Sequence, residues 1–211
     1  MPDAGELIDG LGRIANEWRP LAVFWHGYFA ALVILLMAEF RPPSAVTGML
    51  LSLPLLSVSV LAWVAANHFN GIVFALIGVV LIVLSTGRKQ DGAQPAPRWM
   101  TAAGMAMFVF GWVYPHFLGA VSFIPYFYSA PTGLIPCPTL SIIIGLALMQ
   151  KGPVSRAWMT VLAVTGVFYG LMGAVYLGVV LDWVLLAGAL LLLIIASKRP
   201  GGSASDILRE R

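Results

Sequence analysis

The sequence has little charge and almost no cysteine. Asp, Glu, Lys and Arg make up only 10% of its 211 residues, whereas a soluble domain carries about 25%. A single cysteine excludes an internal disulfide, a CxxC redox pair and a cysteine-rich zinc site. No basic face with interleaved aromatics is present, so a nucleic-acid partner is not predicted. The chain also lacks a Walker loop, a GxSxG elbow, an HExxH motif and a lysine within any apolar segment, and no motif predicts an enzyme.

Apolar residues take the place of charge. They form 60% of the chain, and the mean hydropathy is +0.91. Seven apolar segments lie near the roughly 17–25 residues that a helix needs to cross a bilayer. These segments are 21–38, 45–67, 70–86, 99–118, 132–150, 156–175 and 179–197. We therefore predict an all-α, polytopic transmembrane helix bundle with seven spans. Six spans with one re-entrant segment is the alternative.

The N-terminal 20 residues have a different pattern. Their apolar residues recur at helical spacing with charged residues between them, which predicts an amphipathic helix on the membrane surface. The first ten residues lack the basic region and apolar core of a signal peptide, so cleavage is not predicted. The predicted organisation is an interfacial helix over 1–20, a transmembrane domain over 21–198 and a flexible cytoplasmic tail over 199–211.

The basic residues predict an orientation. With seven spans, ten of the twelve Lys and Arg residues fall on the side of the C-terminus, and only Arg13 and Arg19 fall on the other side. Short cytoplasmic loops are enriched in Lys and Arg. The predicted location is therefore the inner (plasma) membrane, with the N-terminus outside and the C-terminus in the cytoplasm.

This topology gathers the chemically active side chains in the outer half of the bundle. Imidazoles beside a thiolate suit copper or zinc. The candidate metal ligands are therefore His68, His116 and Cys137. The candidate ligand-binding residues are His26, Asn70, Tyr114 and Asp182. Structural roles are the alternatives: histidines bonded to carbonyls or water, a packed cysteine, a tyrosine in the aromatic belt, and Asp182 as the N-cap of the last helix.

Residues 131–139, PTGLIPCPT, place three prolines, a glycine and the cysteine at the front of the fifth segment. Pro136 and Pro138 either begin the helix, where a missing N–H costs nothing, or interrupt a helix that starts at Pro131 and free two of its carbonyls. In both cases Cys137 lies near a helix N-terminus, where the dipole favours thiolate. The uncharged stretch before it is predicted to lie in the interface or to dip back into the protein.

Glycines recur in GMAMFVFG (104–111) and GVFYGLMGAVYLG (166–178). Small residues let helices approach closely. These segments predict tight packing, or association with a second copy or another membrane protein. The lipid bilayer is the other predicted partner.

Four stretches occur in a suggestive order: NEWRP (16–20), WVAANHFNG (63–71), APTGLIPCPT (130–139) and GVVLDWVLLAGA (178–189). Together they resemble an uncharacterised family of bacterial multi-spanning membrane proteins, a domain of unknown function with a Pro-Cys-Pro-Thr signature. Arg19 and Gly71 depart from the family pattern. The resemblance implies a multi-spanning fold and no particular activity. It highlights Asn16, Trp18, His68, Asn70, Cys137 and Asp182.

Three functions remain open from the sequence. The first is binding or transport of a small ligand or transition-metal ion at a polar site in the outer half. The second is a structural or accessory subunit of a membrane complex without its own chemistry. The third is a membrane oxidoreductase with haem held by His68 and His116. A proton relay built on carboxylates is not predicted, because Asp182 is nearly the only acid in an apolar segment.

Overall fold

The structure is a computed structural model that describes residues 3–38, 40, 42–86, 94–119, 122–151 and 155–198. The predicted flexible tail, 199–211, lies outside the described residues, as do Arg41, Arg88 and Lys89 of the predicted cytoplasmic loops.

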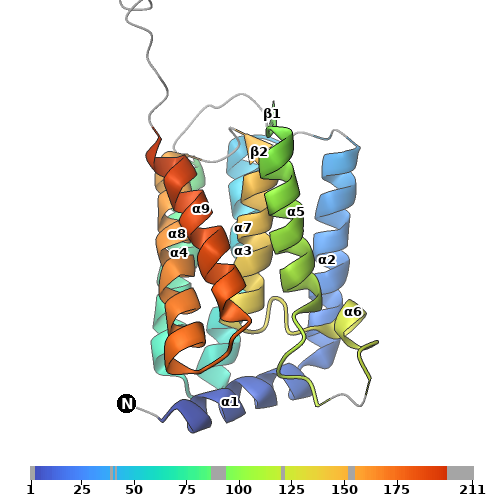
Figure 1. The fold of residues 1–211 in the computed structure, drawn as a ribbon, viewed down its shortest axis with the longest axis vertical. Helices are drawn as coiled ribbons and strands as arrows, with labels where there is room; N and C mark the ends of the chain where they lie inside the picture. Colours follow the sequence, from blue (N-terminus) through green and yellow to red (C-terminus); the bar gives the residue numbers. More distant parts are fainter. Residues whose placement is uncertain are drawn as a thin grey trace, which may run out of the picture.

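Helices make up almost all of the fold (Figure 1). They are α1 (Ala4–Glu17), α2 (Arg19–Met37), α3 (Ser44–Val64), α4 (His68–Thr86), α5 (Arg98–Val113), α6 (Tyr126–Ser129), α7 (Pro136–Met149), α8 (Arg156–Leu171), the π-helical turn η1 (Met172–Tyr176) and α9 (Asp182–Ser197). One antiparallel pair of two-residue strands, β1 (Gln94–Pro95) and β2 (Gln150–Lys151), joins the start of α5 to the end of α7.

Four helical stretches are long and apolar enough to cross a membrane: Arg19–Met37, Ala45–Val64, His68–Thr86 and Arg156–Tyr176. Helices α7 and α9 are apolar but shorter. The prediction of an all-α membrane protein is therefore confirmed at this level.

Two predicted segments have different ends in the structure. The predicted segment 99–118 ends as helix at Val113, because Tyr114 leaves the helical conformation (φ −6°, ψ 91°) and precedes a proline. The predicted segment 132–150 becomes helical only at Pro136, after a buried, non-helical stretch over 130–135.

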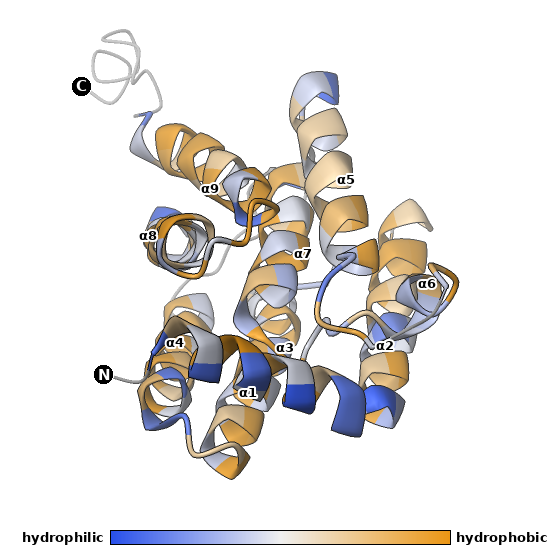
Figure 2. Ribbon diagram, turned by 60° about the horizontal axis from the view of Figure 1, so that its bottom comes forward, coloured by the Kyte–Doolittle hydropathy of each residue, from blue (hydrophilic) through white to orange (hydrophobic). Residues whose placement is uncertain are grey.

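Helix α1 lies across one end of the bundle, and β1 and β2 lie at the other (Figure 1). Figure 2, seen from the α1 end, shows α1 crossing in front of the other helices with hydrophilic residues along it. A capping box closes its N-terminus, with Asp3 bonded to the first turn and Glu6 bonded back to the cap. Ile14 and Ala15 are buried toward the bundle. We call the end of the bundle that α1 crosses the α1 end, and the end with β1 and β2 the β end.

Helix α7 is the centre of the bundle, since each residue from Pro136 to Leu148 is buried. It packs against α5 through glycines. A Cβ on Gly145 would lie 2.6 Å from the carbonyl oxygen of Gly104, and a Cβ on Gly104 would lie 2.6 Å from that of Gly145. The two backbones therefore touch. Such close contact stabilises helix pairs where lipid provides no hydrophobic driving force.

Helices α8 and α9 pack in the same way. Gly170 lies against the backbone of Leu186, and Gly166 lies against Ala189. The glycines singled out in the sequence thus pack helices of one chain together. Association with a second copy or another membrane protein stays a prediction.

Candidate functional site

The stretch PTGLIPCPT folds as a hydrogen-bonded approach to α7. The Thr132 hydroxyl donates to the Gly111 carbonyl on α5 at 2.7 Å. The Thr139 hydroxyl accepts from the Gly133 N–H at 2.8 Å and donates to the Ile135 carbonyl at 2.6 Å. Pro136 is the first residue of the helix. The prolines therefore begin α7, and the alternative of a helix from Pro131 is wrong.

Gly133 is the hinge of this approach. Its φ of +77° lies in the left-handed region, and the ring of Trp25 occupies the space that a Cβ would need. Only glycine satisfies both constraints. The turn at Gly133 directs the chain so that Cys137, in the first turn of α7, lies at the α1 end.

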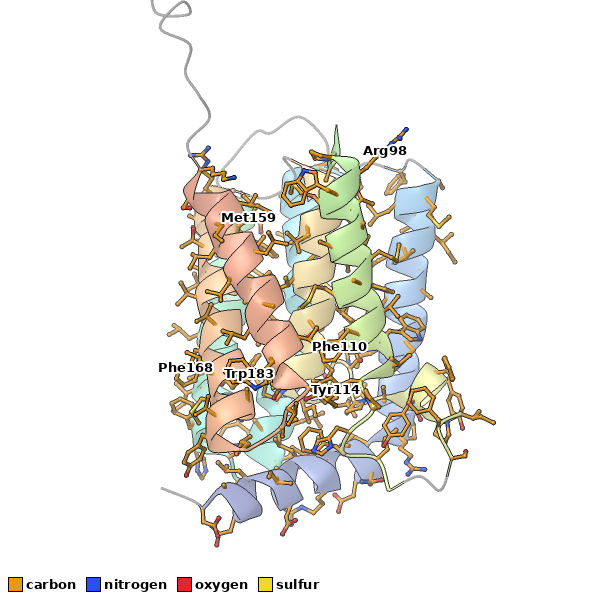
Figure 3. All side chains as sticks on the ribbon, in the orientation of Figure 1. Arg98, Phe110, Tyr114, Met159, Phe168 and Trp183 are labelled. Atoms are coloured by element: carbon orange, nitrogen blue, oxygen red, sulfur yellow. The ribbon has the colours of Figure 1, made fainter. Side chains whose placement is uncertain are left out.

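Asp182 is the buried acid at this end. It is 1% exposed, and its Oδ1 accepts a hydrogen bond from the Tyr114 hydroxyl at 2.7 Å. The interpretation of Asp182 as an N-cap is wrong: Leu181 precedes the helix, no side chain caps it, and Asp182 is its first residue. The carboxylate turns inward to Tyr114 instead. Figure 3 labels Tyr114, at the end of α5, and Trp183, the residue that follows Asp182 in α9.

Cys137 lies near the same carboxylate. It is buried and lines the same cavity as Asp182. Two adjacent anions repel strongly in a buried site, so the pair carries at most one negative charge. With Asp182 ionised, Cys137 stays a neutral thiol, contrary to the expectation of a thiolate from the helix dipole alone.

The π-helical turn makes room for this carboxylate. A Cβ on Gly173 would collide with Oδ2 of Asp182. The backbone N–H of Val179 donates to the Gly173 carbonyl at 2.9 Å, which closes the turn toward α9. Single π turns inside α-helices occur frequently at functional sites. Here the turn places a residue without a side chain against Asp182.

A second polar pair joins α4 to α8. The Tyr169 hydroxyl donates to Oδ1 of Asn70 at 2.7 Å. The Asn70 backbone N–H donates to Oδ1 of Asn67 at 3.1 Å, at the start of α4. This pair fixes the distance between two helices at the α1 end.

These groups border a cavity of about 510 Å³. It lies between the start of α4, the starts of α7 and α9, the end of α8 with η1, and the inner side of α1. Its lining is mostly apolar and includes a few polar groups. The lining residues are Leu7, Leu11, Asn67, Phe69, Asn70, Phe117, Ile135, Pro136, Cys137, Phe168, Tyr169, Met172, Gly173, Tyr176, Leu177 and Asp182. Pockets for small molecules have this size and composition.

Asn16 holds α1 over the cavity. Its amide donates to the Phe117 carbonyl at 2.9 Å, and its Oδ1 accepts from the Gly119 N–H at 3.0 Å. Phe117, which lines the cavity, has a φ of 72°. A non-glycine residue keeps such a conformation only where its surroundings hold it. The contacts of Asn16 supply that restraint.

The three histidines lie elsewhere. His26 is 4% exposed, and its ring nitrogens contact the carbonyls of Ala22 at 2.8 Å and Trp112 at 3.0 Å. His68 is exposed, packs against Trp63 and lines an adjoining cavity of about 320 Å³ under α1, which shares Leu7, Leu11, Asn67 and Phe69 with the first. His116 packs against Phe117 in the loop after α5, where desolvation lowers its pKa from 6.5.

The predicted metal site is not formed. The described part of the chain, which includes His68, His116 and Cys137, contains no group of three or more His, Cys, Asp and Glu side chains that could hold a metal ion. His26 is buried against backbone carbonyls, and none of the three histidines lines the cavity that Cys137 borders. His116 is not among the residues that line the cavity beside His68, and the haem pair stays a prediction.

Sequence reasoning placed Asn70, Tyr114, Cys137 and Asp182 in one half of the molecule. The structure brings Asn70, Cys137 and Asp182 to one cavity, and Tyr114 is hydrogen-bonded to Asp182. Several lining residues were missed. They are Phe69, Phe117, Phe168, Tyr169, Gly173 and Tyr176. The three aromatics and Gly173 within GVFYGLMGAVYLG could have indicated a binding site. The sequence pattern was interpreted only as a packing surface.

Comparison with known proteins gives no match: no family model, curated protein or solved structure matches this chain. The resemblance to the family with the Pro-Cys-Pro-Thr signature stays a prediction from the sequence.

Proposed function

We propose that the chain is a seven-span integral membrane protein that binds a small amphiphilic molecule in the cavity at the α1 end. The observation that carries the proposal is a largely apolar cavity of about 510 Å³ with a hydrogen-bonded buried carboxylate at its wall. Apolar walls take up a hydrocarbon body, and a few convergent polar groups orient a head group.

The direction of the helices supports seven spans. Helices α2, α3, α4, α5, α7, α8 and α9 run between the two ends in alternating directions (Figure 1). Helix α7 has only 14 residues, or about 21 Å at 1.5 Å per residue. Non-helical backbone at membrane depth is tolerated where protein surrounds it, and the buried stretch 130–135 meets that condition.

Charge supports the orientation within a bacterial inner membrane. The described starts of α5 and α8 and the end of α9 carry Arg98, Arg156 and Lys198 at the β end. That end would face the cytoplasm. Helix α1, with buried Ile14 and Ala15 and exposed charged residues, would lie in the outer interface.

Access from the flank favours an amphiphile over a hydrated ion. Phe69 on α4 and Phe168 on α8 both line the cavity, and their ring centroids are 6.1 Å apart. Both rings are also exposed, at 57% and 42%. The cavity therefore reaches the side of the bundle that would face lipid. A molecule dissolved in the bilayer would enter past this pair of contacting rings.

Native mass spectrometry of protein purified in mild detergent tests the proposal. Leu177→Trp would fill the cavity, and Val180→Trp, three residues away at a 75% exposed position, is the matched control. We expect one small amphiphile retained per wild-type and Val180→Trp chain, and none on folded Leu177→Trp. Equal retention by all three proteins, or by none after incubation with a total lipid extract, would contradict the proposal.

A further inference from the structure

Resting on the proposed function, we propose that the head group of the ligand is an organic cation of the ammonium type. It would be held by the Asp182 carboxylate and the aromatic rings of the cavity. The class follows from the charge, the ring content and the hydrogen bonding of the lining.

The lining contains one acid and no base. None of its residues is Lys, Arg or His. Within the described chain, Asp182 accepts its side-chain hydrogen bond from the Tyr114 hydroxyl, which is a neutral donor. Neutral donors stabilise a carboxylate without cancelling its charge. A buried negative charge without a cationic partner favours a ligand that brings one.

The lining is also rich in aromatic rings. Phe69, Phe117, Phe168, Tyr169 and Tyr176 contribute five rings around one cavity. The faces of such rings attract ammonium groups, and aromatic cages are a common way to bind quaternary ammonium ligands. The carboxylate and the aromatic rings therefore each favour a cation. Neither feature attracts an anion.

The helix ends do not reverse this preference. Three helices begin near the cavity, and free N–H groups at a helix start ordinarily favour anions. In α7, however, Pro136 and Pro138 remove two of the first N–H groups. In α4, the N–H groups of Asn70 and Gly71 already donate to Asn67. In α9, Asp182 itself sits at the first position.

Equilibrium binding of a matched series tests the inference. The probes are tritiated dodecyltrimethylammonium, dodecylammonium, dodecanol and dodecanoate, which share one tail. The protein is the full chain in phosphatidylcholine nanodiscs, with empty discs subtracted. We expect both cations to bind wild type at least about tenfold more tightly than the alcohol or the carboxylate, a difference of about 1.4 kcal/mol. Asp182→Asn should lose that advantage, and Asp9→Asn, at an exposed acid on α1, should keep it.

Each other outcome has a defined meaning. Equal binding of dodecanol, or tighter binding of dodecanoate, would overturn the cationic class and leave the proposed function intact. Binding of no probe above empty discs, together with no retained adduct on wild type, would overturn both. If Asp182→Asn does not fold, Phe117→Leu replaces it. This variant should weaken binding of the cations severalfold and leave dodecanol unchanged, and equal weakening of both would contradict the inference.

Discussion

The two ends of the bundle are built differently around the same central helix. At the β end, α7 is sealed by contacts such as Gly104 with Gly145, and Leu148, Trp158 and Leu192 are completely buried. At the α1 end, the chain leaves a cavity of about 510 Å³, and long-range side-chain hydrogen bonds join the helices around it. The difference shows how one small bundle separates the packing that stabilises it from the cavity in which we propose that a ligand binds.

The largest effect should come from loosening the β end. We expect Gly145→Ala to lower the free energy of unfolding by about 3 kcal/mol, because the new Cβ would collide with the backbones of Gly104 and Phe108. Gly27→Ala on α2, where nothing lies within 4 Å of the added atom, is the control. Unfolding in mixed micelles with increasing dodecyl sulfate measures both. Equal stability of the two variants would show that the α5–α7 contact is not tight.

The next effect concerns the α1 end. Tyr114→Phe removes a donor to a buried carboxylate, and hydrogen bonds to charged groups contribute about 1.5–3 kcal/mol. Tyr28→Phe removes a hydroxyl that donates to the neutral Leu50 carbonyl at 2.7 Å, and should cost about 1 kcal/mol. The same micelle titration compares them. A smaller loss for Tyr114→Phe than for Tyr28→Phe would mean that Asp182 is not charged.

A single substitution type can contrast the two ends directly. Leu148→Phe at the β end overfills a fully buried site and should cost about 1–2 kcal/mol. Leu11→Phe on α1 extends into the cavity and should change stability by under about 0.5 kcal/mol. It should also weaken ligand retention, whereas Leu148→Phe should not. Similar costs at both sites would indicate that the cavity is closed in solution.

The smallest effect is a pH dependence at the α1 end. Desolvation lowers the pKa of His116 from 6.5 in the folded protein. Below pH 6.5 the unfolded chain therefore binds more protons at this residue, and its contribution to stability falls as the pH falls. Thermal unfolding of wild type and His116→Gln between pH 5 and pH 8 measures it. The variant should lose stability less steeply below pH 6.5. Parallel profiles would contradict the assignment.

The sequence predicted the helices better than the site. Apolar segments placed α2, α3 and α4 to within a few residues, because helix length in a bilayer is set locally. The end of α5 at Val113 and the late start of α7 were missed, because turns at Tyr114 and Gly133 depend on contacts with distant helices.

The candidate site shows where periodicity fails. Asn70, Cys137 and Asp182 were placed in the same half, but whether side chains from different helices meet depends on interhelical packing, which spacing along one helix does not encode. The prediction of a metal site with His68 and His116 was wrong for this reason. Gly173 and Tyr176 were missed for another reason: the π turn at Met172–Tyr176 shifts the phase of the helix, so an α-helical pattern assigns the wrong face from this turn onward.

The lone cysteine gives the chain a built-in chemical reporter. Cys137 borders the cavity, is 9% exposed, and is the only thiol in 211 residues. A fluorinated or spin-labelled maleimide would attach at one place without any engineered mutation. Comparing labelling rates for reagents of increasing width would measure how far the cavity opens near Phe69 and Phe168. The natural sequence can therefore be labelled for spectroscopy at a residue that borders the cavity.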